Sequence, residues 1–245
     1  MKKLIIISLI LFLLLLARES HAVANPTIIG TNTTGNATGA NPSFAHTVPS
    51  TGQNRVLVVL WQEDGALASG MTWNGAAMTK IAVHTAAAVA HQSAWYIVNP
   101  DTGAHTVALT KGSGGSGWIA LTLQDVNQSA PQDATGVAGS GGSGTSWTAD
   151  IGTPASDSLT INFGATANAT AWIAGTGQTE IETPFEMPNL GAYEFVSSYE
   201  VGEDIMTESW TNSVGYDQGS VAFTYQAPTV SVSRPRIEAN PIIYE

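Results

Sequence analysis

Short runs with the alternation of β-strands, separated by turn residues, recur along most of this sequence. Apolar side chains occupy every second position at Leu159, Ile161 and Phe163, for example, which places them on one face of a strand. Residues 56–61 are instead continuously apolar, as expected for a strand covered on both faces. Asn74-Gly75 lies between two such runs and is the strongest two-residue signal for a hairpin.

These patterns predict an all-β fold. About nine strands at near-regular spacing indicate a single-domain antiparallel β-sandwich, jelly-roll-like in its organisation. Two Gly/Ser runs, at residues 112–117 and 139–144, match the glycine spacing of nucleotide-binding loops. Strand-like residues follow each run where a nucleotide site needs a helix, so we expect both runs to be loops without a phosphate site.

The N-terminus has the pattern of a secretory signal peptide. Lys2 and Lys3 precede an apolar run of about 14 residues, shorter than the roughly 20 of a membrane-spanning helix. Ser20 and Ala22 fit the small-residue cleavage rule, so we expect residues 1–22 to be removed, with Ala24 as a second possible site. The expected location is secreted, extracellular or cell-surface, with no membrane attachment after cleavage.

Three segments follow the signal peptide. Residues 23–54 are a Thr/Asn/Gly-rich N-terminal arm, residues 55–227 the sandwich domain, and residues 228–245 a C-terminal tail. The chain has no cysteine, which excludes disulfides, thiolate catalysis and Cys-bound zinc. A formal net charge of -11 opposes a phosphate backbone, so nucleic acid is not an expected partner.

Several segments of the domain resemble a β-sandwich module of bacterial secreted, cell-surface and phage-associated proteins. The resemblance covers residues 55–227 and rests on hairpin turns and core positions: MTWNGAAMT at 71–79, AWYIVNP at 94–100, GAHTV at 103–107, LQDVNQSAP at 123–131 and GSVAFTY at 219–225. It implies an extracellular binding or structural module, mostly without an assigned biochemical role, and supplies no catalytic residues.

The most unusual composition lies between residues 180 and 208, where eight acids occur with no Lys or Arg. Clustered carboxylates near glycines suit Ca²⁺, and Glu200, Glu203, Asp204 and Glu208 are the candidate metal ligands. A solvated, self-repelling surface is the alternative interpretation. Catalytic use by a polysaccharide-degrading enzyme, a glycoside hydrolase or lyase, is less favoured because no three acids have the spacing of sandwich glucanases.

Aromatic residues in the same third of the chain offer a second kind of site. Rings exposed beside carboxylates stack on sugar faces, and the candidate ligand-binding residues are Tyr193, Tyr199, Trp210 and Tyr216. Packing within the core is the alternative role for each ring.

The tail suggests that the chain pairs with a second copy of itself. Residues 228–233 alternate polar and β-branched residues, and Arg234 and Arg236 follow. Such a segment adds to an exposed sheet edge on its own subunit or on the next one, and the arginines complement the acidic stretch. A solvated terminus is the alternative.

These observations predict a non-catalytic β-sandwich used for binding or adhesion, with an extracellular glycan as a possible partner and Ca²⁺ as a possible cofactor. The alternatives are a self-assembling filament or surface-layer subunit, a homo-oligomer through residues 228–245, and a sandwich-fold polysaccharide-degrading enzyme.

Overall fold

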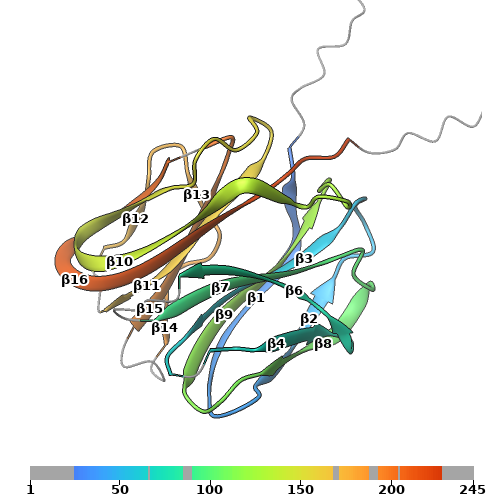
Figure 1. Ribbon diagram of the computed structural model, residues 1–245, viewed down its shortest axis with the longest axis horizontal. Coiled ribbons are helices and arrows are strands. Elements are labelled where there is room, and N and C mark those ends of the chain that lie inside the picture. The colour runs from blue at the N-terminus through green and yellow to red at the C-terminus, as the bar shows by residue number, and fades with distance from the viewer. Residues whose placement is uncertain are drawn as a thin grey trace, which may run out of the picture.

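A computed structural model describes residues 25–65, 67–84, 90–167, 171–187, 193–203 and 205–227. The predicted signal peptide, residues 1–22, and the predicted tail, residues 228–245, therefore lie outside the described residues. The described part of the chain is all-β, with sixteen strands in three antiparallel sheets (Figure 1). This confirms the predicted antiparallel sandwich. It has more strands than the sequence indicated because residues 27–38, 43–48 and 132–150 also form strands and four strands are only two or three residues long. No helix among these residues is long and apolar enough to span a membrane.

The central sheet has five strands. In spatial order they are β1 (Thr27–Thr38), β9 (Gly115–Gln124), β3 (Val56–Glu63), β7 (His91–Val98) and β6 (Thr79–His84). A four-stranded sheet covers one face and consists of β2 (Ser43–Val48), β8 (Gly103–Thr110), β4 (Gly70–Trp73) and β5 (Ala76–Ala77).

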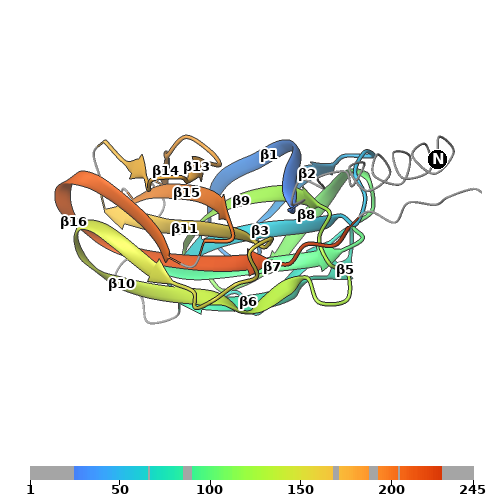
Figure 2. The ribbon, with the colours of Figure 1, turned by 90° about the horizontal axis from the view of Figure 1, so that it is seen from above.

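A seven-stranded sheet covers the other face of the central sheet. Its main path is β10 (Gln132–Asp150), β16 (Ile205–Phe223), β11 (Leu159–Ala167), β15 (Tyr193–Val201) and β13 (Thr179–Glu180). Two short strands pair beside this path, β12 (Ile173–Ala174) with β16 and β14 (Phe185–Met187) with β15. Figure 2 shows β11 and β15 at one end of the molecule and β2 and β8 at the other, with β3 and β9 between them.

The alternation of β3 divides the core into two layers. Leu57, Val59 and Trp61 pack toward the four-stranded sheet, whereas Val56, Val58 and Leu60 pack toward the seven-stranded sheet. All eight residues of β3 are buried, which confirms that residues 56–61 are covered on both faces. Each such side chain contributes roughly 1.5–3 kcal/mol through removal from water, so the central sheet anchors both outer layers.

The Asn74-Gly75 turn also forms as predicted. Both residues have positive φ, 49° and 84°, as the tightest antiparallel hairpins require. The turn joins β4 to β5. Residues 27–38 and 43–48 of the Thr/Asn/Gly-rich segment supply β1 and β2, so this segment contributes strands to two of the three sheets.

The predicted loop at residues 139–144 is wrong, because this Gly/Ser run is the middle of β10. It pairs with residues 214–219 of β16. The glycines have a steric reason: a Cβ at Gly141 would lie 3.1 Å from both Asp217 Cγ and His84 Nε2, and a Cβ at Gly139 would lie 2.8 Å from His84 Cβ. Small residues thus let the ribbon of β10 and β16 approach the central sheet.

This ribbon is strongly bent. Between the pairs Gly144–Val214 and Ser146–Ser209, β16 has four intervening residues where β10 has one. Such an irregularity curves the ribbon, and Figure 1 shows β10 and β16 curling together at one end of the molecule. Past the bend, Trp147 reaches Gly164 of β11 and Glu208 reaches Ser198 of β15. The ribbon therefore buries part of β11 and β15 on the side away from the central sheet.

Candidate functional site

Strand β16 carries two buried carboxyl groups that serve different interfaces. Asp217 is fully buried and contacts residues at the ends of β6 and β7 in the central sheet. Glu208 is 1% exposed and contacts β15 and the segment before β12, beneath the bent ribbon. Buried charges need partners, so the environment of each group indicates what it can do.

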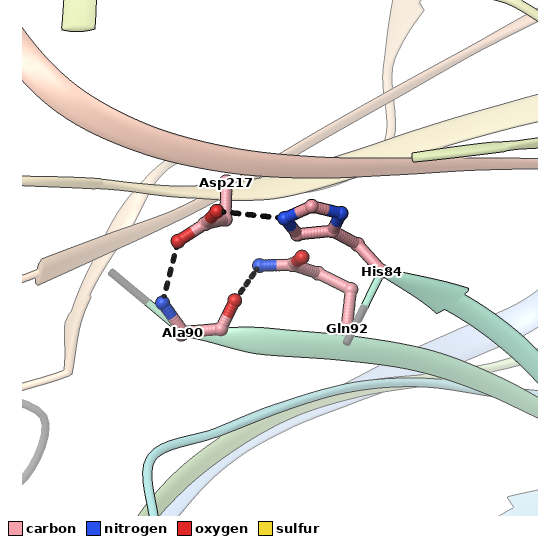
Figure 3. Close-up of polar contacts among 4 residues, drawn as sticks. All are labelled: His84, Ala90, Gln92 and Asp217. Carbon is pink, nitrogen blue, oxygen red and sulfur yellow. Dashed lines mark hydrogen bonds and ion pairs between the residues drawn. The ribbon is translucent and has the colours of Figure 1, made fainter. Parts of the chain in front are cut away.

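Asp217 joins the seven-stranded sheet to the central sheet (Figure 3). The backbone N–H of Ala90 donates to its Oδ2 at 2.8 Å, and His84 Nε2 lies 3.1 Å from its Oδ1. Gln92 Nε2 donates to the carbonyl oxygen of Ala90 at 2.7 Å, which fixes the peptide that faces the carboxylate. The cluster thus ties two layers together through polar contacts inside an otherwise apolar interface.

An aspartate that orients a histidine is also a component of nucleophilic catalysis. That chemistry needs a hydroxyl or thiol beside the imidazole. Within the described ranges, no serine, threonine or tyrosine hydroxyl lies within hydrogen-bond distance of the His84 ring. The described residues therefore place an acid beside an imidazole, and the contacts of Asp217 tie the two sheets together.

Glu208 has the most perturbed carboxyl group in the described chain. Burial, and to a smaller extent the charge of Glu180, raise its pKa from 4.5 to about 8. Hydrogen bonds from Ser198 Oγ at 2.7 Å and Trp172 Nε1 at 3.2 Å, together with the Asn162 amide, favour the charged form but do not offset burial. Glu208 is therefore held as a neutral acid at pH 7.

The hydrogen-bond geometry around Ser198 agrees with a protonated Glu208. Ser198 Oγ lies 2.7 Å from Glu208 Oε1 and 2.8 Å from Gln178 Oε1, and a hydroxyl has one proton to donate. If Glu208 donates its proton to Ser198 Oγ, the Ser198 proton is free for Gln178. One proton on Glu208 thus satisfies both contacts and links β16, β15 and the loop that carries Gln178.

Among the candidate metal ligands that the structure describes, Glu208 lies apart from Glu200 and Glu203. Glu200 and Glu203 lie near each other at the end of β15, where burial first and then the charge of Glu203 raise the pKa of Glu200. Glu203 Oε1 accepts the backbone N–H of Ile205 at 3.2 Å. Glu208 is turned into its own buried cluster, and Asp204 lies outside the described residues. No three His, Asp or Glu side chains converge in the part of the chain that the structure describes.

The four candidate sugar-stacking rings are divided between two hydrophobic clusters. Trp210 and Tyr216 pack with Trp147, and Trp210 is buried, with Nε1 donating to the carbonyl oxygen of Gly144 at 2.8 Å. Tyr193 and Tyr199 are half-buried against the core between the seven-stranded and central sheets. The four residues therefore do not share one exposed face.

A surface that the sequence analysis did not single out lies on the four-stranded sheet. Its side away from the core carries ten residues, every one of them Gly, Ala, Ser or Thr: Ser43, Ala45, Thr47, Gly70, Thr72, Ala77, Ala104, Thr106, Ala108 and Thr110. We call this the hydroxyl face. The alternation of small and large residues along β2 and β8 was the signal that could have revealed it.

The register confirms that the hydroxyl face is continuous across strands. Ser43 lies opposite Ala108, which lies opposite Thr72, and Ala45 lies opposite Thr106. All of these side chains are exposed or half-buried. The face therefore carries only short, uncharged side chains and is rich in hydroxyl and methyl groups.

Comparison with family models, with curated proteins and with solved structures finds no match. The resemblance to a bacterial extracellular module thus stays a prediction.

Proposed function

We propose that this chain is a secreted or surface-displayed, non-catalytic β-sandwich module for binding or adhesion, with an extracellular glycan as its ligand. The observation that carries the proposal is the hydroxyl face of the four-stranded sheet. Large side chains of β2, β4 and β8 point into the core, so a partner meets only small side chains.

The chemistry of this face suits an extended, uncharged, polyhydroxylated partner. Each Ser or Thr hydroxyl donates one hydrogen bond and accepts others, as sugar hydroxyls do, and Thr and Ala methyl groups contact sugar C–H groups. Neighbouring strands repeat at about 4.8 Å and same-face residues along a strand at about 6.7 Å. This regular grid offers contacts along the length of a polysaccharide.

A glycan array probed with the full chain, with and without EDTA, tests the proposal. We expect binding to neutral polysaccharides that is insensitive to high salt, because the hydroxyl face carries no charge. Loss of signal in EDTA would support the predicted Ca²⁺ cofactor. Shortened glycan products after incubation would contradict a non-catalytic role and favour the polysaccharide-degrading enzyme, and no binding to any glycan would overturn the glycan ligand.

A further inference from the structure

Asn74 differs from every other asparagine of the chain in the residue that follows it, because it alone precedes a glycine. Asn74 and Gly75 form the two-residue turn between β4 and β5, and both are exposed. Asparagine is one of the chemically labile residues of proteins, since the backbone nitrogen of the next residue can attack its side-chain amide carbon. A glycine in the next position has no side chain to obstruct this attack.

The turn leaves the attacking nitrogen open to solvent. Among the described residues, no acceptor binds the backbone N–H of Gly75, whereas that of Asn74 donates to the Thr106 carbonyl oxygen at 3.0 Å. Outside the two adjoining residues, no heavy atom lies within 4 Å of the position that a Cβ on Gly75 would take. A base from solvent can therefore reach the Gly75 N–H.

The side chain of Asn74 also makes a contact that depends on its amide. Its Nδ2 donates to Oδ2 of Asp101 at 3.1 Å, and Asp101 lies in the exposed turn before β8. A carboxylate in place of the amide would bring two negative charges together where the natural turn has a hydrogen bond. Loss of the amide therefore removes a contact that holds the turn.

The chain contains its own controls for backbone conformation. Asn41 and Asn99 are exposed and have φ of 51° and 46°, close to the 49° of Asn74. A proline follows each of them, and a proline nitrogen has no proton to lose. These two asparagines therefore share the left-handed conformation of Asn74 but lack its reactive neighbour.

We propose that Asn74 is a site of spontaneous deamidation in the folded protein. The Gly75 nitrogen loses its proton to a solvent base and bonds to Asn74 Cγ, the bond from Cγ to Nδ2 breaks, and ammonia leaves after taking a proton from water. Water then opens the resulting succinimide ring at either carbonyl carbon and yields aspartate or isoaspartate. The net change replaces ammonia by water, and the reaction does not depend on the proposed glycan ligand.

The isoaspartate product would alter the border of the hydroxyl face. Its main chain passes through Cβ and Cγ of residue 74, so the turn gains one main-chain atom. Thr72 and Ala77 lie opposite each other beside this turn, and the Met78 N–H donates to the Met71 carbonyl oxygen at 2.9 Å. Because the length of a hairpin turn fixes the register of its strands, the longer turn loosens β5.

Peptide mapping by mass spectrometry, after incubation of the full chain at neutral pH, measures the reaction at each asparagine. We expect Asn74 to gain the mass difference between an amide and an acid at least about 10-fold faster than Asn41 or Asn99. Part of the product should be isoaspartate, and the rate should rise with pH because the Gly75 nitrogen must lose a proton. The variant Asn74→Gln keeps an amide but needs a larger ring, so it should lose the reaction.

A reaction at Asn74 no faster than at Asn41 and Asn99 would overturn the proposal. The same incubation in urea separates the folded from the unfolded chain, and a product found only in urea would mean that the folded turn protects Asn74. Hydrogen exchange tests the structural consequence. The isoaspartate form, separated by chromatography, should exchange the Met78 amide at least about 10-fold faster than the natural protein, and equal exchange would contradict the loosening of β5.

Discussion

Replacement of Glu208 by Gln should remove a large part of the alkaline sensitivity of this fold. The amide keeps the size and neutrality of the protonated acid but does not titrate. In the natural protein, an unfolded Glu loses its proton near pH 4.5, whereas the folded protein keeps the proton on Glu208 up to about pH 8. The folded state binds more protons between these values, so its stability falls as pH rises through this range.

The size of the effect follows from the shift. The pKa of Glu208 rises from 4.5 to about 8 on folding. At about 1.4 kcal/mol for each pH unit, the protein therefore loses at most about 5 kcal/mol of stability by pH 8 and no more above it. The Glu208→Gln variant should therefore gain stability over the natural protein by about 1.4 kcal/mol per pH unit between pH 5 and 8.

Urea denaturation monitored by tryptophan fluorescence at several pH values from 5 to 9 measures this difference. The matched control is Asp150→Asn, which changes an exposed acid at the end of β10 in the same sheet, and the effect at Glu208 is compared with it. If the free-energy difference between Glu208→Gln and the natural protein is constant with pH, Glu208 is not the buried neutral acid described above.

Two further substitutions test other parts of the fold. Gly164→Ala should destabilise the protein by about 1–3 kcal/mol, because the added Cβ would overlap the Trp147 ring. The control is Gly144→Ala, whose Cβ would meet its nearest neighbour at an ordinary 3.6 Å. Equal urea midpoints for the two alanine variants would contradict the packing around Trp147. Burial lowers the pKa of His46 to about 4 from 6.5, so stability should fall by up to about 3 kcal/mol as pH drops through that interval. His46→Gln should reduce this loss of stability at acid pH, measured by denaturation, and the control His105→Gln, at a half-buried position, should not. If His46→Gln leaves the loss unchanged, buried His46 is not its cause.

Local patterns predicted the elements whose structure is set by neighbouring residues. The apolar run at residues 56–61 and the Asn74-Gly75 turn are examples, because burial on both faces and positive φ leave direct marks in the sequence. Residues 139–144 were misinterpreted because glycine normally weakens a strand. Here the need for glycine comes from His84 and Asp217, which approach the ribbon from distant parts of the chain.

The buried acid could have been found from the same kind of pattern. Met206, Glu208 and Trp210 occupy alternate positions of β16 and are all buried, so the period of two places Glu208 on a covered face. The number of acids around it drew attention to charge rather than to alternation. The pairing of Asp217 with His84 and Ala90 had no comparable signal, because it joins residues more than 120 positions apart.

The central claim is that the hydroxyl face of the four-stranded sheet binds a glycan, and a comparison of two surface variants tests it most directly. The first replaces Thr72 and Thr106 of this face with Lys, and the second replaces Thr148, an exposed threonine on β10, with Lys. Sedimentation with insoluble polysaccharide measures the bound fraction of each variant and of the natural protein, after melting curves show that all three are folded. We expect the first variant to lose at least about 10-fold in affinity, or about 1.4 kcal/mol, and the Thr148→Lys variant to bind like the natural protein. Equal binding by all three proteins would contradict the account.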